Sequence, residues 1–105
     1  MKYRFHPSAR VELNDSIDYY EDCRLGLGIE FAEEVYSTIQ RIIQFPEAWS
    51  QLSPNSRRCL TNRFPYGIVY QVLENKILIV AVMQLNRKPD YWKNRVSSRQ
   101  GTESE

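Results

Sequence analysis

The sequence predicts an α+β fold in which a four-stranded, curved and mostly antiparallel sheet carries an antiparallel helical hairpin on one face. Two observations lead to this prediction. Two stretches between residues 8 and 44 place apolar residues at helical spacing, whereas β-rich stretches occupy residues 2–6 and 57–83. The length of 105 residues suits one domain. We therefore expect the order β-α-α-β-β-β over residues 1–95, followed by a polar, flexible tail over 96–105.

The first strand leads directly into the first helix. Residues 2–6 alternate between apolar and polar side chains, which is a short strand pattern. Pro7 and Ser8 then open a helix, because Pro is tolerated in a first turn and Ser caps helix N-termini. Apolar residues follow one face of the segment 8–24, which predicts an amphipathic helix. The glycine-rich segment 25–28 ends this helix and reverses the chain.

The second helix and the remaining strands complete the pattern. A helix is predicted over 29–44, and it ends there because Pro46 disfavours a helical conformation at Phe45. Residues 46–56 contain turn-forming residues and are expected to be a loop. Three strands follow, with a hairpin turn at 74–76 before the last of them: 57–62, 66–73 and 77–83. The last strand is continuously apolar, which is typical of a central strand covered on both faces.

Charge is unevenly distributed along the chain, although the net charge is only +1. Residues 1–50 contain five basic and nine acidic residues, a balance of −4. Residues 51–100 contain nine basic and two acidic residues, a balance of +7. A basic second half predicts an electrostatic surface for phosphate-rich partners. The alternative is that the two halves interleave on the surface and form no basic face.

Several protein classes do not fit the sequence. No stretch reaches the about 18 consecutive apolar residues of a membrane span, and the N-terminal residues lack the apolar region of a signal peptide. We therefore expect a cytoplasmic protein with no membrane partner. Cys23 and Cys59 are far apart and belong to no CxxC motif, so we expect buried or half-buried free thiols rather than a disulfide or a metal site.

Short motifs in the second half of the chain match one family pattern. They are Arg63-Phe64-Pro65-Tyr66, Ile68-Val69-Tyr70, Ile79-Val80-Ala81-Val82, and then Arg87, Pro89, Tyr91, Trp92 and Arg95. With these motifs and the preceding helical hairpin, residues 1–95 resemble the RelE/ParE superfamily of bacterial toxins, of the plasmid-stabilisation type.

This resemblance implies the toxin half of a type II toxin–antitoxin pair, neutralised by a cognate antitoxin. RelE-like members are ribosome-dependent endoribonucleases that cleave messenger RNA without a metal, and ParE-like members poison DNA gyrase without hydrolysing anything. Both targets stay open at this point, as does a degenerate, non-toxic member that acts only as an antitoxin-binding co-repressor of its operon. A homodimer and a toxin–antitoxin hetero-oligomer are both compatible with the resemblance, and no cofactor is implied.

The resemblance also implies individual site residues. Arg87 matches the arginine that RelE-like nucleases place near the scissile phosphate. The implied catalytic residues are Arg87, Arg63 and Tyr91, and the implied target-binding residues are Arg57, Arg58, Lys88, Lys93, Trp92 and Gln84, with no metal ligand among them. Gly67 and Gln84 depart from the pattern, because many members have a basic residue at the first position and His at the second.

The chemistry of RNA cleavage exposes what the chain lacks. Attack by the 2′-OH requires a proton acceptor, donors for the phosphorane and an acid for the leaving oxygen. Arginine supplies the donors, because its guanidinium is forked and always charged, and is a poor base for the same reason. His6 is the only His and lies far from Arg87 in sequence, which leaves Asp90 beside Tyr91 as a candidate base. The sequence therefore favours a gyrase poison or a weakened nuclease.

Trp92, one of the implied target-binding residues, has a structural alternative, which is to pack over the core after the last strand.

Overall fold

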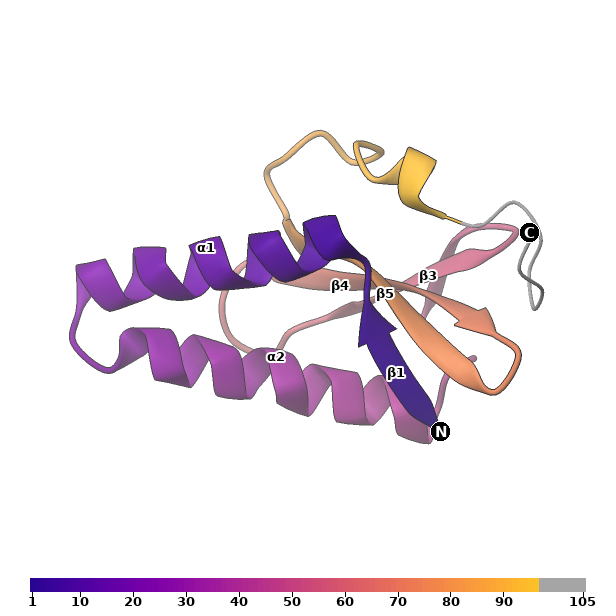
Figure 1. Cartoon of the computed structure of the whole chain (residues 1–105), viewed down its shortest axis with the longest axis horizontal. Helices are drawn as coiled ribbons and strands as arrows, with labels where there is room; N and C mark the ends of the chain where they lie inside the picture. The colour runs from indigo at the N-terminus through magenta and orange to yellow at the C-terminus, as the bar shows by residue number, and fades with distance from the viewer. Residues whose placement is uncertain (97–105) are drawn as a thin grey trace.

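The computed structural model describes residues 1–96, and within them the chain forms two α-helices, one five-stranded sheet and a short 3₁₀ helix (Figure 1). The elements in chain order are β1 (Lys2–Phe5), α1 (Pro7–Cys23), α2 (Leu27–Gln44), β2 (Ser50–Ser53), β3 (Ser56–Leu60), β4 (Tyr66–Leu73), β5 (Lys76–Gln84) and the 3₁₀ helix η1 (Lys93–Arg95). The α+β class, the helical hairpin and the mostly antiparallel sheet are as predicted.

The sheet has the strand order β1-β5-β4-β3-β2. β1 is parallel to β5, whereas the other three neighbouring pairs are antiparallel. A parallel pair requires a long connection, and here the helical hairpin and three strands lie between its two members. The continuously apolar β5 is therefore an inner strand, and seven of its nine residues are buried. This confirms the prediction of a central strand covered on both faces.

The predicted count of four strands is one too few. Ser50–Ser53, which lies in the segment predicted as a loop, forms the edge strand β2 and pairs with β3. Three of its four residues are exposed, so no apolar alternation marks it as a strand in the sequence. A register irregularity between Gln51 and Ser53 further shortens the regular pairing. An exposed, polar and irregular strand is typical of a sheet edge.

The N-terminus of α1 is capped by His6 rather than by Ser8. The Nδ1 atom of His6 accepts a hydrogen bond from the backbone N–H of Ser8 at 3.1 Å, and Pro7 occupies the first helical turn. The reversal between the helices uses Gly26, whose φ of 88° is in the left-handed region that favours glycine. The carboxylate of Glu21 accepts hydrogen bonds from the backbone N–H groups of Gly26 and Gly28 and so fixes this turn.

The sheet separates two apolar clusters. The larger cluster lies between the sheet and the helices and includes Leu13, Phe31 and Tyr70. The smaller one lies on the other face and includes Val69, Met83 and Trp92, with Tyr91 and Val96 packed against it. The second cluster shows that the segment after β5 covers the sheet. The rest of the tail predicted over 96–105 lies outside the described residues.

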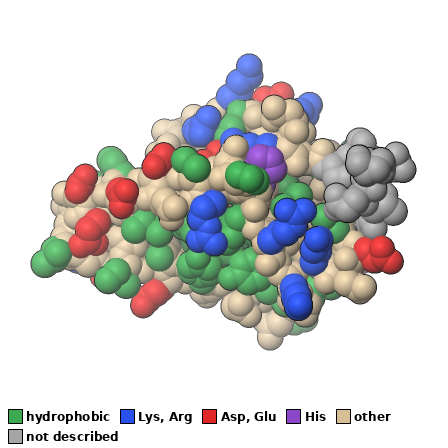
Figure 2. Space-filling view, in the orientation of Figure 1, with side chains coloured by type: hydrophobic (Ala, Val, Ile, Leu, Met, Phe, Trp, Pro, Cys, Tyr) green, Lys and Arg blue, Asp and Glu red, His purple; other side chains and the backbone are tan. Residues whose placement is uncertain are grey.

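Charged side chains are segregated on the face shown in Figure 2. Most visible Asp and Glu side chains gather over the distal half of the helical hairpin, and most visible Lys and Arg side chains lie over β1, the start of α1 and the segment after β5. No helix within residues 1–96 is long and apolar enough to cross a membrane. Cys59 is a buried free thiol, as expected, whereas Cys23 is exposed and so departs from the expectation of burial.

Gly28 provides a test of how closely the two helices pack. A Cβ atom at this position would lie 2.6 Å from the carbonyl oxygen of Ile17 in α1, which is a contact with rigid backbone. We expect Gly28→Ala to lower the free energy of unfolding by about 1–3 kcal/mol, because the helices must move apart. Chemical denaturation measures this change. Ser37→Ala, on the exposed side of the same helix, is the control and is expected to change it by less than about 0.5 kcal/mol.

Candidate functional site

The carboxylate of Glu12 joins three parts of the molecule. Its Oε1 atom accepts a hydrogen bond from the backbone N–H of Val82 in β5 at 3.0 Å. Its Oε2 atom lies 3.0 Å from Nη2 of Arg95 and 3.7 Å from Nη1 of Arg87, both in the segment after β5. The side chain of Glu12 is only 13% exposed, so these interactions are largely shielded from water. We call Glu12, Arg87, Tyr91 and Arg95 the Glu12 cluster.

A β-bulge in β5 explains why this carboxylate is needed. Val69 and Tyr70 of β4 pair with Ala81 and Ile79, which leaves Val80 without a counterpart. The bulge shifts the backbone pairing of the residues that follow. β1 cannot pair with them, because its register ends at Ile79, where His6 donates the last hydrogen bond. Glu12 accepts from the N–H of Val82, and Nη1 of Arg95 donates to the carbonyl of Val80 at 3.1 Å.

Arg87 lies at the rim of the Glu12 cluster. Its guanidinium carbon is 3.7 Å from the ring centroid of Tyr91, and its side chain is 49% exposed. Arg95 approaches the same ring at 5.1 Å but is only 14% exposed. Arg87 therefore presents its positive charge to solvent, whereas Arg95 is largely buried and binds Glu12 and the carbonyl of Val80. Beside them, Glu12, Ser16, Tyr66, Gln84 and Arg87 line part of a shallow pocket between α1 and the ends of β4 and β5.

The Tyr91 hydroxyl is buried and has no hydrogen bond of good geometry to any residue of the described chain. Burial, and then the nearby negative charge of Glu12, raise the pKa of Tyr91 well above its usual value of 10. This hydroxyl therefore stays protonated at neutral pH and does not accept a proton there. Gln84, at the end of β5, pairs with Tyr66, and the Tyr66 hydroxyl lies 3.0 Å from Oγ of Ser16.

Arg63 has its partners on a different helix. Its Nη2 atom lies 3.0 Å from Oε1 of Glu30, and its backbone N–H donates to Oε2 of Glu34 at 3.1 Å. Both carboxylates belong to α2, so Arg63 holds the β3–β4 connection against that helix. The same connection contains Phe64, whose φ of 72° is unusual for a residue with a side chain. Its ring packs against Tyr20 at 4.8 Å between centroids, which holds this backbone conformation in place.

Arg57 and Arg58 point to opposite faces of β3, as neighbours in a strand do. Arg57 pairs with Tyr70 of the helix-side cluster and donates to the carbonyl of Trp49 at 2.8 Å. Arg58 pairs with Val69 of the other cluster. Among the described residues, no hydrogen bond, ion pair or shared pocket joins Arg57, Arg58, Arg63 and Arg87 into one group.

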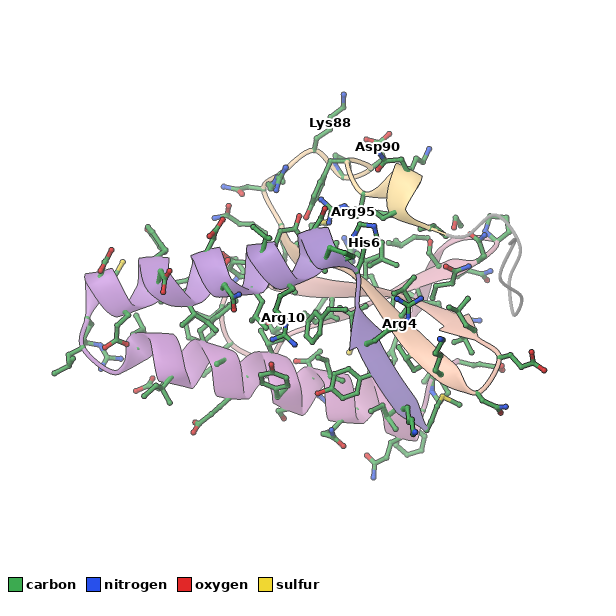
Figure 3. All side chains as sticks on the ribbon, in the orientation of Figure 1. Arg4, His6, Arg10, Lys88, Asp90 and Arg95 are labelled. Atoms are coloured by element: carbon green, nitrogen blue, oxygen red, sulfur yellow. The ribbon has the colours of Figure 1, made fainter. Side chains whose placement is uncertain are left out.

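The remaining predicted residues divide between surface and core. Lys88 and Asp90 project outward from the segment after β5 (Figure 3), and Lys93 lies 4.0 Å from the Asp90 carboxylate. Trp92 is 3% exposed and belongs to the smaller apolar cluster. Trp92 therefore packs over the core, as its structural alternative predicted. In the same view His6 lies beside Arg95 at the start of α1.

The comparisons with known proteins agree with this architecture. A family model described as "ParE toxin of type II toxin-antitoxin system, parDE" matches residues 3–89. This chain belongs to that family. A solved structure described as "Chromosomal ParDE TA system from P. aeruginosa" is similar in fold, with a TM-score of 0.69 at 15% identity, over 82% of this chain and 97% of that one. No curated protein matched the chain.

Membership of the ParE toxin family confirms the resemblance drawn from the motifs between Arg63 and Arg95. The family pattern directed attention to Arg87 and Tyr91, but it did not identify Glu12. In the sequence Glu12 is one of several acids on the polar side of an amphipathic helix, and nothing distinguishes it from Asp15 or Asp18.

The coupling between Glu12 and Arg95 provides a quantitative test. In a double-mutant cycle of Glu12→Ala and Arg95→Ala, we expect a coupling of about 1–3 kcal/mol in the free energy of unfolding, because both side chains are largely buried. The exposed pair Asp90 and Lys93 is the matched control, and its coupling is expected to be below about 1 kcal/mol. Equal coupling in the two pairs would contradict the role given to Glu12.

The cap at His6 predicts a pH dependence of stability. Burial lowers the pKa of His6 below its usual 6.5, with further contributions from Arg95 and Arg4 that outweigh Glu12. The folded protein therefore binds fewer protons here than the unfolded chain does, so this contribution is complete above pH 6.5 and is lost as the pH falls through the folded pKa. We expect His6→Gln to lose about 0.5–1.5 kcal/mol at pH 8 and less at pH 5, measured by denaturation at both values. A constant difference would rule out this linkage.

Proposed function

We propose that this ParE-family chain is a toxin that binds DNA gyrase, does not cleave RNA, and is held inactive by an antitoxin. The observation that carries the proposal is the surroundings of Arg87. This arginine faces the Glu12 carboxylate, which already binds Val82 and Arg95, and the Tyr91 ring, whose hydroxyl stays protonated. A surface that only binds a protein needs a cation and an aromatic ring but no base.

Three candidate bases have another role, and the fourth, Asp90, projects outward with Lys93 4.0 Å from its carboxylate. Both oxygens of Glu12 already interact, one with Val82 and the other with Arg95. The Nδ1 atom of His6 accepts the capping hydrogen bond of α1. Tyr91 is kept protonated by burial. These three assignments support a binding role for Arg87 over a role in phosphodiester cleavage.

An antitoxin partner is supported by family membership and by the surface of the helical hairpin. The similar solved structure is described as a ParDE toxin–antitoxin system. In the present chain several large apolar side chains of the hairpin are exposed: Val11, Tyr19, Leu25 and Ile29. Exposed apolar residues along helices suit an amphipathic segment of a partner protein. The acidic side chains around them disfavour nucleic acid at this surface (Figure 2).

Induction of the protein in bacterial cells tests the proposal. We expect filamentation, DNA breaks and an SOS response, with messages on ribosomes remaining intact. Arg87→Ala is expected to reduce toxicity at least about tenfold, because it removes the exposed cation of the binding surface, while antitoxin binding persists. Arg4→Ala, which removes a cation from β1, is the matched control and is expected to remain toxic.

Two other outcomes would each replace the proposal with a named alternative. New cuts in ribosome-bound messages that disappear with Arg87→Ala would establish the ribosome-dependent nuclease. A complete absence of a growth defect, with antitoxin binding retained, would establish the non-toxic co-repressor. Full toxicity of Arg87→Ala would show that the binding surface lies elsewhere on the molecule.

A further inference from the structure

We propose that a pocket lined by residues of α2, β2 and β3 binds a carboxylate carried by an acidic, partly apolar segment of a partner protein. We call it the Arg41 pocket. Its lining includes Arg41 of α2, Trp49 before β2, Ser50 of β2, and Arg58 and Leu60 of β3. The site is separate from the Glu12 cluster, because β4 lies between β3 and β5. This inference goes beyond the proposed function and does not depend on gyrase being the target.

Three buried N–H donors of the Arg41 pocket have no acceptor. They are Nε of Arg41, Nε1 of Trp49 and Nε of Arg58, and none has a hydrogen-bond partner among residues 1–96. Buried donors are almost always paired in native proteins, so three in one place require an explanation. All three are donors, and two belong to cations. Arg41 and Arg58 are half-buried, so a rotation of either guanidinium would turn a donor towards the negatively charged oxygens of a ligand in the pocket.

No ion pair within the described chain neutralises the two arginines of the pocket. Arg41 donates only to neutral acceptors: Oγ1 of Thr38 at 3.1 Å, the carbonyl of Leu60 at 3.3 Å and Sγ of Cys59 at 3.6 Å. Its guanidinium also lies 5.7 Å from the Trp49 ring centroid. No carboxylate lines the pocket or forms an ion pair with Arg41 or Arg58 within residues 1–96. Two cations without a carboxylate predict an anionic ligand.

Gly67 makes room for this arrangement. A Cβ atom at Gly67 would lie 2.8 Å from Cδ and 3.0 Å from Cγ of Arg58. The absence of a side chain on β4 therefore lets the aliphatic part of Arg58 lie flat across the neighbouring strand. Gly67 is one of the two departures from the superfamily pattern, and a longer side chain there would compete with Arg58 for the same space. The chain thus lacks a basic residue at position 67 and has the side chain of Arg58 beside that position instead.

The surroundings favour a peptide carboxylate over the phosphates of a nucleic acid. Glu34 and Glu47 flank the pocket, since Glu34 accepts from the backbone N–H of Asn62 and Glu47 precedes Ala48 in its wall. These acids disfavour an extended polyanion but leave room for one carboxylate. Leu60 is 48% exposed in the pocket wall and suits apolar side chains next to that carboxylate. Ser50 also begins β2, the outer strand of the sheet, whose free edge suits an extended peptide.

The test uses NMR on the full chain with a defined probe. The probe is a ten-residue peptide of alternating leucine and glutamate, and its control has glutamine in place of glutamate. We expect the acidic peptide to shift the indole N–H resonance of Trp49 and to leave that of Trp92 unchanged, because Trp92 lies in the other apolar cluster. Loss of one indole signal in Trp49→Phe assigns the two resonances.

Three variants test which residues contribute to peptide binding. Arg58→Met, which keeps the aliphatic stem, is expected to weaken peptide binding at least about tenfold, and Gly67→Ala should weaken it in the same direction by displacing Arg58. Arg4→Met removes one positive charge from the opposite edge strand and is expected to change binding less than about twofold. Amide spectra of each variant report whether it is folded. If Arg58→Met is unfolded, the proposal is tested by comparing the loss of peptide binding in Gly67→Ala with that in Arg4→Met.

Four results would overturn the proposal. They are an unshifted Trp49 resonance, equal binding of the glutamine peptide, equal losses in Arg4→Met and Arg58→Met, and tighter binding of a ten-nucleotide single-stranded RNA at the same resonances. The last result would make the pocket a phosphate site. Because the readout is binding to purified protein, a failure here is distinguishable from a failure of the gyrase proposal.

Discussion

The structure depends on the Glu12 carboxylate, which accepts a hydrogen bond from β5 beyond the point where the neighbouring strand β1 has ended. β1 ends at Phe5 so that the chain can turn into α1, and β5 continues past it with a bulge at Val80. Backbone N–H and C=O groups of an unpaired strand cost free energy when they are buried without a hydrogen-bond partner. Glu12 and Arg95 fill this place, because Glu12 accepts from the N–H of Val82 and Arg95 donates to the carbonyl of Val80. The same ion pair fastens the segment after β5, which closes the second apolar cluster.

This arrangement separates the positive charges by role. Arg95 is used inside the molecule, Arg63 holds a connection against α2, and Arg87 remains half exposed at the rim of the Glu12 cluster. Arg41 and Arg58 face a pocket without a carboxylate on the other side of β4. The basic second half of the chain therefore supplies several small cationic sites with different surroundings. Such sites suit contacts with proteins better than the continuous track that a nucleic acid backbone requires.

Much of the fold could be predicted because the relevant signals are local. The apolar run of 77–83 and the helical periodicity of α1 and α2 each reflect burial of a single element. The edge strand β2 could not be predicted, since its polar residues are held by pairing with β3 alone. Glu12 was missed for a related reason: its role arises from a bulge 68 positions later in the chain, at Val80. The superfamily pattern located Arg87, but whether its neighbours include a base is a property of the folded structure.

The most direct test of the claim that Arg87 binds without catalysing is a reconstitution with purified components. The protein is added in parallel to DNA gyrase with supercoiled plasmid and to ribosomes programmed with messenger RNA. We expect gyrase–DNA cleavage complexes to accumulate, to a lesser extent with Arg87→Ala and to the same extent with Arg4→Ala, while the messenger RNA stays intact. Cleavage of the messenger RNA with no effect on gyrase would contradict this claim.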